Sequence, residues 1–60
     1  MFPQVEVSTF TNTYRRTFVD VQAAERFAKQ VIQAAKQRTS AVVEVQGREV
    51  MAFDNRRMAA

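Results

Sequence analysis

The sequence predicts an α+β fold in which one amphipathic helix packs on one face of a four-stranded, mainly antiparallel sheet. Short segments rich in β-branched and aromatic residues flank a single long segment with helical periodicity. The few turn-forming residues fall between these segments, so the order of elements is strand, strand, helix, strand, strand. A two-layer ββαββ sandwich follows, because a helix with one apolar stripe needs a sheet face to cover it.

The N-terminal part predicts two strands joined by a tight turn. Residues 4–10, QVEVSTF, alternate apolar and polar side chains with the period of a half-buried strand. Residues 13–19, TYRRTFV, are rich in the residue types that favour strands. A two-residue loop at 11–12 is reasonable, since Asn tolerates positive φ. Neighbours in a strand point to opposite faces, so we expect Arg15 on the uncovered face, diagonal to Glu6, and Arg16 on the helix side.

The middle of the chain predicts a helix from Val21 to about Arg38. Asp20 is a good N-cap residue, and no proline or glycine interrupts the segment that follows. Lys36 and Arg38 fall in the last predicted turn, where cations suit the helix dipole. Apolar residues recur at helical spacing and form one stripe: Val21, Ala24, Phe27, Ala28, Val31, Ile32 and Ala35.

The C-terminal part predicts strands at 41–46 and 48–53, with a turn at Gly47 and a tail at 55–60 that we expect to fray. The third strand can pair antiparallel with the first, which gives the order 2-1-3-4 that we prefer. It can instead lie beside the second strand through a right-handed crossover. In either arrangement residues 1–60 form one small domain.

The register of the second hairpin has two alternatives. With a two-residue loop at 46–47, Met51 and Phe53 point to the uncovered face and Glu44 lies opposite Glu49. With a three-residue loop, Met51 and Phe53 point inward. In both registers the uncovered face is more apolar than a solvated face, so we expect something to cover it. In the first register the candidate interface residues are Phe10, Val19, Val42, Met51 and Phe53.

The composition excludes most enzyme chemistry. The chain has no histidine and no cysteine, so the usual general base, the usual nucleophile pair, disulfides and thiolate metal ligands are absent. Its six carboxylates show no clustered spacing, and its single glycine excludes a glycine-rich phosphate loop. We therefore expect no enzyme activity, no catalytic residue, and no metal, cofactor or small-molecule ligand.

The sequence also lacks targeting signals. No apolar run approaches the ~20 residues of a membrane span, and the N-terminus has no secretory pattern. We therefore expect no membrane contact and a cytoplasmic location. Met1 opens the chain without a tag, which suggests a complete small gene product. Size alone suggests an accessory or regulatory factor, including a phage- or plasmid-encoded one.

Two classes of partner remain. The favoured hypothesis is protein–protein interaction through the uncovered sheet face, with another protein or in a homodimer. The alternative is a nucleic acid bound by an arginine-rich rim with aromatic help. The net charge is +3, and seven of the nine basic residues are arginine, whose planar fork suits phosphate and carboxylate, although codon usage in a GC-rich genome gives the same bias. The candidate polyanion-binding residues are Arg15, Arg48, Arg56 and Arg57.

Overall fold

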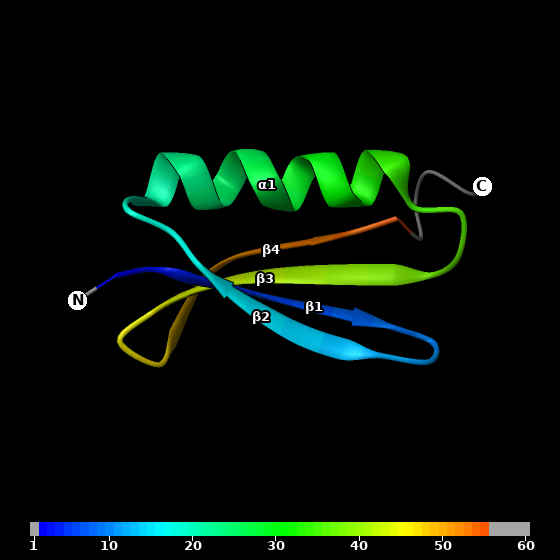
Figure 1. Ribbon diagram of the computed structural model, residues 1–60, viewed down its shortest axis with the longest axis horizontal. Helices are drawn as coiled ribbons and strands as arrows, with labels where there is room; N and C mark the ends of the chain where they lie inside the picture. The colour runs from blue at the N-terminus through cyan, green and yellow to red at the C-terminus, as the bar shows by residue number, and fades with distance from the viewer. Residues whose placement is uncertain (1, 56–60) are drawn as a thin grey trace.

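The computed structural model describes residues 2–55, in which four strands and one helix follow each other in the predicted order (Figure 1). They form one antiparallel sheet with strand order β2-β1-β3-β4, and α1 packs on one face of it. The two-layer α+β architecture and the order 2-1-3-4 are therefore confirmed. Within the described residues, α1 is too short and too polar to cross a membrane. The elements are β1 (Gln4–Thr9), β2 (Thr13–Thr17), α1 (Val21–Ala34), β3 (Thr39–Val45) and β4 (Arg48–Asp54).

The hydrophobic core lies between α1 and the two central strands. Its buried side chains come from β1, β3 and α1 alone. At its margin, β4 adds half-buried side chains, and so does Phe18, which follows β2. Alanine is frequent in this core, so the helix backbone can lie close to the sheet. The buried apolar residues are Val5, Val7, Ala24, Ala28, Ile32, Ala41 and Val43.

α1 begins where the sequence predicts and ends earlier. The Asp20 carboxylate accepts a hydrogen bond of 2.8 Å from the backbone N–H of Ala23, which confirms Asp20 as the N-cap. At the other end Ala35 leaves the helical region, with φ −69° and ψ 134°. Lys36 and Arg38 therefore lie beyond the helix and not in its last turn, which corrects the predicted boundary.

Asn55 fixes the connection between α1 and β3. Its Oδ1 accepts from the backbone N–H of Thr39 at 3.0 Å, and its Nδ2 donates to the carbonyl of Gln37 at 2.7 Å. The hydroxyl of the buried Thr39 donates to the same Gln37 carbonyl at 2.9 Å. The Gln37 carbonyl lies outside the helix, and these two bonds satisfy it. The bond to the Thr39 N–H holds the backbone where β3 begins. Asn55 is therefore no part of a fraying tail, and the remaining tail residues, 56–60, lie outside the described residues.

The turn between β1 and β2 lies one residue earlier than predicted. The Thr9 backbone N–H donates to the Asn12 carbonyl at 2.7 Å, so the two-residue loop is Phe10 and Thr11. The Thr9 hydroxyl oxygen accepts from the backbone N–H of Asn12 at 3.0 Å and that of Thr11 at 3.4 Å. A side chain that bonds the following backbone in this way favours the turn that it closes. The register changes by two residues, so every side chain keeps its predicted face.

The turn between β3 and β4 uses two residues with positive φ. Gln46 has φ 54° and Gly47 has φ 77°, as a two-residue hairpin loop of the favoured type requires. Next to this turn Glu44 lies opposite Glu49, as the two-residue loop predicts. Glycine adopts this conformation without cost, whereas glutamine adopts it at a cost in free energy.

A β-bulge in β4 then changes the register of the second hairpin. The register shifts between Val43 and Glu44, which leaves Val50 as an extra residue in β4. Beyond it Val43 lies opposite Met51, and Phe53 pairs with an inward-facing residue of β3. Met51 and Phe53 therefore pack against the core on the helix side. The structure thus combines the two predicted registers, and the placement of Met51 and Phe53 on the uncovered face is wrong.

The strained turn residue predicts a stabilising substitution. We expect Gln46→Asn to raise the free energy of unfolding by about 0.5 kcal/mol, because Asn-Gly suits a loop with two positive φ angles. Gln46→Val should lower the free energy of unfolding, because a β-branched side chain fits positive φ poorly. Urea unfolding measures both, and an equal effect of the two substitutions would contradict the loop geometry.

The bulge predicts opposite responses to the same new side chain at neighbouring positions. Met51→Lys should lower the free energy of unfolding by about 3 kcal/mol, because the charge enters the helix side of the sheet. Ala52→Lys should change it by less than about 0.5 kcal/mol, because Ala52 is exposed on the other face. Thermal unfolding followed by circular dichroism distinguishes the two variants. A destabilised Ala52→Lys variant and a stable Met51→Lys variant would contradict the inward placement of Met51.

Candidate interface on the β2 side of the sheet

The uncovered face of the sheet is more polar and more acidic than the sequence predicts. Residues that alternate with the buried ones point to this face, and serines and threonines occupy many of these positions. Its apolar centre consists of Val42 and Ala52, which lie opposite each other. Four of the six carboxylates of the chain occupy positions on this face: Glu6, Glu44, Glu49 and Asp54.

The structure does not bring the five candidate interface residues together. Phe10 is at the tip of the first hairpin with 86% of its surface exposed, and Val19 lies in the connection from β2 to α1 with 78% exposed. Val42 is half-buried on the uncovered face. Met51 and Phe53 lie on the opposite side of the sheet, against the core. No continuous surface joins these residues.

The candidate polyanion-binding residues are also separated. Arg15 lies directly opposite Glu6, not diagonal to it, and its Nη2 forms an ion pair of 3.2 Å with the Glu6 carboxylate. Arg48 begins β4 on the helix side, since it pairs with an inward-facing residue of β3. Arg56 and Arg57 lie outside the described residues. Within residues 2–55, therefore, no arginine-rich rim forms around the sheet.

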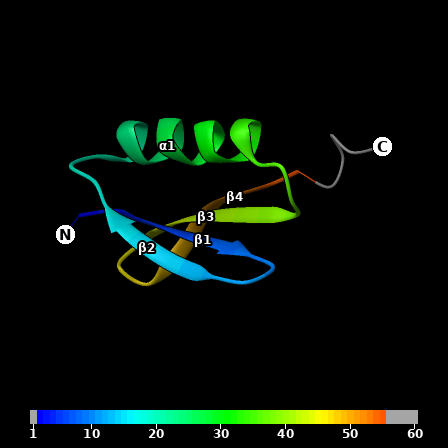
Figure 2. The same ribbon diagram turned by 45° about the vertical axis from the view of Figure 1, so that its right-hand side comes forward.

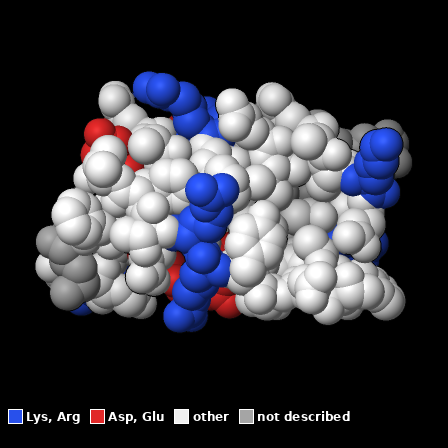
Figure 3. All heavy atoms as spheres, viewed as in Figure 1, with Lys and Arg blue, Asp and Glu red and all other residues white. Residues whose placement is uncertain are grey.

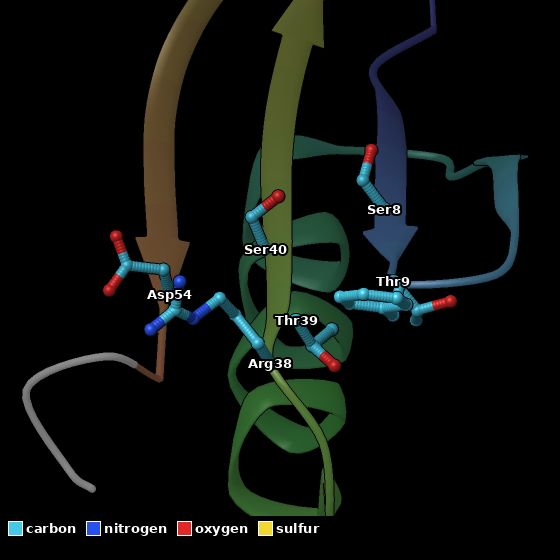
Figure 4. Close-up of a pocket in the computed structure, with 7 residues that line it drawn as sticks. Ser8, Thr9, Arg38, Thr39, Ser40 and Asp54 are labelled. Atoms are coloured by element: carbon cyan, nitrogen blue, oxygen red, sulfur yellow. The ribbon is translucent and has the colours of Figure 1, made fainter.

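A shallow pocket of 430 Å³ opens on the uncovered face at the ends of β1 and β4 (Figure 4). Figure 4 shows Arg38 reaching from the start of β3 toward Asp54, with the hydroxyls of Ser8 and Ser40 on neighbouring strands. These groups mix hydrogen-bond donors with one cation and one carboxylate, so they suit small polar groups without selecting a class. The lining residues are Ser8, Thr9, Phe10, Arg38, Thr39, Ser40 and Asp54.

β2 extends beyond the area that α1 covers. The helix packs mainly on β3, and also on β1 and β4, whereas β2 lies outside its main contacts (Figure 2). All five residues of β2 are exposed. Tyr14 lies opposite Val7 and Arg16 lies opposite Val5, so both point to the helix side. They stand beside the helix and not under it, and 42% of the Tyr14 surface is exposed.

An aromatic cluster joins the end of β2 to the first half of α1. The rings of Phe18 and Phe27 have their centroids 5.1 Å apart and are tilted by 39°. The guanidinium carbon of Arg16 lies 5.1 Å from the Phe27 centroid and 6.0 Å from that of Phe18. At such distances the cation is attracted to the negative face of an aromatic ring. Arg16 is therefore held against the helix, and its stem packs on the rings.

A hollow of 300 Å³ lies between β2 and the second half of α1. Tyr14 stands on the sheet side of this hollow, and Val31 and Ala34 stand on the helix side. Lys36, just after the helix, also lines the hollow and adds a positive charge to it. We call the surface from the Arg16–Phe27 contact past Tyr14 to Lys36 the β2–α1 groove.

The cations of the β2–α1 groove are available for an external partner. In the described part of the chain, ion pairs join Arg15 to Glu6 and Lys29 to Glu25, and no carboxylate pairs with Arg16 or Lys36. Figure 3 shows basic side chains at the centre of this side of the molecule, where β2 lies in front, and at two of its margins. Acidic side chains also lie beside the central basic ones in Figure 3, so the groove side is distinguished by the unpaired Arg16 and Lys36, while four carboxylates lie on the uncovered sheet face.

The sequence indicated only part of this surface. The alternation in residues 13–19 places Tyr14 and Arg16 on the helix side, and the structure confirms this. The alternation alone does not mark the two residues as candidates, because the sequence does not show how far α1 reaches across the sheet. Lys36 was assigned to a helix that ends before it.

Comparison of the chain with models of protein families, with curated proteins and with solved structures gave no match. In residues 2–55, no three histidine, cysteine, aspartate or glutamate side chains gather as ligands for a metal ion. The functional proposal therefore rests on the β2–α1 groove itself.

The contact between Arg16 and the aromatic rings predicts a measurable contribution to stability. We expect Arg16→Met to lower the free energy of unfolding by about 0.5–1 kcal/mol, because the new side chain keeps the apolar packing and loses the cation. Arg15→Met removes an exposed ion pair and should cost less than about 1 kcal/mol, with a loss that fades in high salt. Urea unfolding at low and high salt separates the two, and identical salt dependence would contradict the cation–π contact.

Proposed function

We propose that the protein is a non-enzymatic binding protein that acts by contact with another protein through the β2–α1 groove. The observation that carries this proposal is the edge position of β2, where Tyr14 and Arg16 stand beside α1 without cover. A half-exposed aromatic ring, an apolar floor and an arginine are the kinds of group that protein interfaces concentrate at their centre.

The uncovered sheet face gives weaker support for the same function. The inward placement of Met51 and Phe53 removes the aromatic and thioether groups that the sequence assigned to it. Its remaining apolar centre, Val42 and Ala52, is small, and four carboxylates share the face with it. Such a surface is compatible with solvent. We therefore place the proposed contact on the other side of the sheet.

Nucleic acid remains the alternative partner. The exposed Tyr14 ring and the unpaired Arg16 and Lys36 favour it, because single strands bind where cations line an aromatic platform. Against it, these cations are few and widely spaced, and the opposite face of this small molecule is acidic. The protein partner is therefore preferred, and the following experiment includes an oligonucleotide.

A peptide selection tests the proposed function. The protein is immobilised, binders are selected from a random peptide display library, and their affinities are measured for the wild type and two matched variants. Tyr14→Thr changes the groove, and Val42→Thr changes the uncovered face with the same new side chain. We expect Tyr14→Thr to weaken binding by about tenfold or more, since truncating an interface tyrosine commonly costs more than 1 kcal/mol. Val42→Thr should bind as the wild type does.

Other outcomes of this selection contradict the proposal. If the selected peptides bind Val42→Thr more weakly than the wild type and bind Tyr14→Thr equally well, the contact lies on the uncovered face. Failure to enrich any peptide, with salt-dependent binding of a single-stranded oligonucleotide that Arg16→Met weakens, would favour the nucleic-acid alternative. Circular dichroism of each variant confirms that it is folded.

Self-association and location stay predictions. Light scattering across a concentration series measures whether the homodimer expected from the sequence forms, and Tyr14→Thr shows whether the groove is its contact. The cytoplasmic location and the accessory or regulatory role are part of the proposal, and neither affects the choice of surface.

A further inference from the structure

We infer that the partner is an extended acidic segment of another protein that adds to the sheet as a fifth strand beside β2. This inference rests on the proposed function, and it names the chemistry and the binding mode of the partner. Strand addition supplies affinity through the backbone and specificity through alternate side chains. Both the backbone groups of β2 and its side chains fit that mode.

The backbone groups of β2 alternate between β1 and the outer edge. The Phe18 N–H donates to the Pro3 carbonyl at 2.9 Å, and Thr9 and Asn12 form the equivalent bond at the turn. In an antiparallel ladder, hydrogen-bonded pairs recur at every second residue, so Tyr14 and Arg16 also direct their backbone groups to β1. The backbone N–H and C=O groups that point to the outer edge belong to Thr13, Arg15 and Thr17.

These outward groups form an edge on which a strand can dock. Within residues 2–55, β2 pairs with β1 alone, and neither proline nor a bulge interrupts it. The opposite edge is different, because the bulge at Val50 bends β4 and breaks the regular spacing of its backbone groups. An incoming strand therefore finds a regular edge only at β2.

The side chains of β2 select an acidic strand. On a docked strand, the residue opposite Arg15 lies on the uncovered face and the residue opposite Arg16 lies on the helix side. Of two adjacent carboxylates in the partner, one would meet Arg16, which pairs with no carboxylate in residues 2–55, and the other would share Arg15 with Glu6. An apolar residue after them would lie against Tyr14 at the mouth of the hollow. Opposite charges directly across a strand pair are stabilising, and like charges are destabilising.

The same arginines act against a second copy of the chain as the occupant. If two copies of β2 paired antiparallel about their centres, Arg15 would face Arg15 and Arg16 would lie opposite Tyr14 of the other copy. Charged edge residues prevent edge-to-edge association in this way. The arginines therefore disfavour identical and basic strands, and they favour an acidic strand over a neutral one.

A synthetic peptide pair tests the charge requirement. The probe is a capped, extended peptide of threonine and valine with two adjacent central glutamates, and its control has lysines in place of the glutamates. In a titration of ¹⁵N-labelled protein, we expect the glutamate peptide to shift the amide signals of Thr13, Arg15 and Thr17 and to slow their hydrogen exchange. The lysine peptide should bind at least about tenfold more weakly, as the loss of two charge pairs requires.

A proline variant tests the strand addition itself. Thr17→Pro removes an outward N–H and leaves the bonds to β1 intact, because proline is tolerated at a sheet edge. We expect it to weaken glutamate-peptide binding about tenfold, the value of one net hydrogen bond. Thr17→Val keeps the N–H and should bind as the wild type does. Thr13→Pro repeats the test if Thr17→Pro does not fold.

The remaining outcomes overturn the inference. Equal affinity of the proline and valine variants would exclude strand addition, and the proposed function would still stand if Tyr14→Thr weakens the peptides from the display library. Equal binding of the glutamate and lysine peptides would exclude an acidic partner. A doubled mass that Thr17→Pro reverses, or an oligonucleotide that displaces the peptide with higher affinity, would replace the acidic strand by a second copy or a nucleic acid.

Discussion

The packing of α1 on β1 and β3 determines most other features of this protein. The buried hydrophobic cluster of the described residues comes from these three elements. A helix is about 10 Å wide with its side chains, and strands lie about 4.8 Å apart. One helix therefore covers the centre of a four-stranded sheet and cannot cover both edges. The exposure of β2 and the groove beside it follow from this difference in width.

The edges of the sheet complete the small core in two different ways. A chain of this size buries only about 60% of the surface that it exposes when unfolded, so partly buried residues matter to its stability. At the β4 edge, the bulge turns Met51 and Phe53 toward the core. At the β2 edge, Arg16 lies over Phe27 and contacts Phe18. The charged side chain of Arg16 thus covers the Phe27 ring on the β2 side of the helix, where no buried apolar side chain of β2 covers it.

The sequence was sufficient for the type and order of the elements, and insufficient for some of their ends and for the register of both hairpins. Periodicity and Asp20 predicted the start of α1 and the order of the elements. The connection after α1 is bonded by Asn55, which contacts Gln37 and Thr39 from a distant part of the sequence, so helical periodicity gives no indication of it. The placement of Met51 and Phe53 has a similar origin, because a single extra residue, Val50, reverses the face of the β4 residues from Met51 to Asp54.

The central pairing of β1 with β3 also constrains how the chain acquires its structure. Each hairpin is local, yet Val5 and Val7 remain uncovered until Ala41 and Val43 arrive from the second half of the sequence. Bringing β1 and β3 together lowers the conformational entropy of the chain before the core contacts between them can form. The first hairpin and the helix thus have no finished core of their own, so we expect the chain to fold as a single cooperative unit and an N-terminal fragment to be unstable alone.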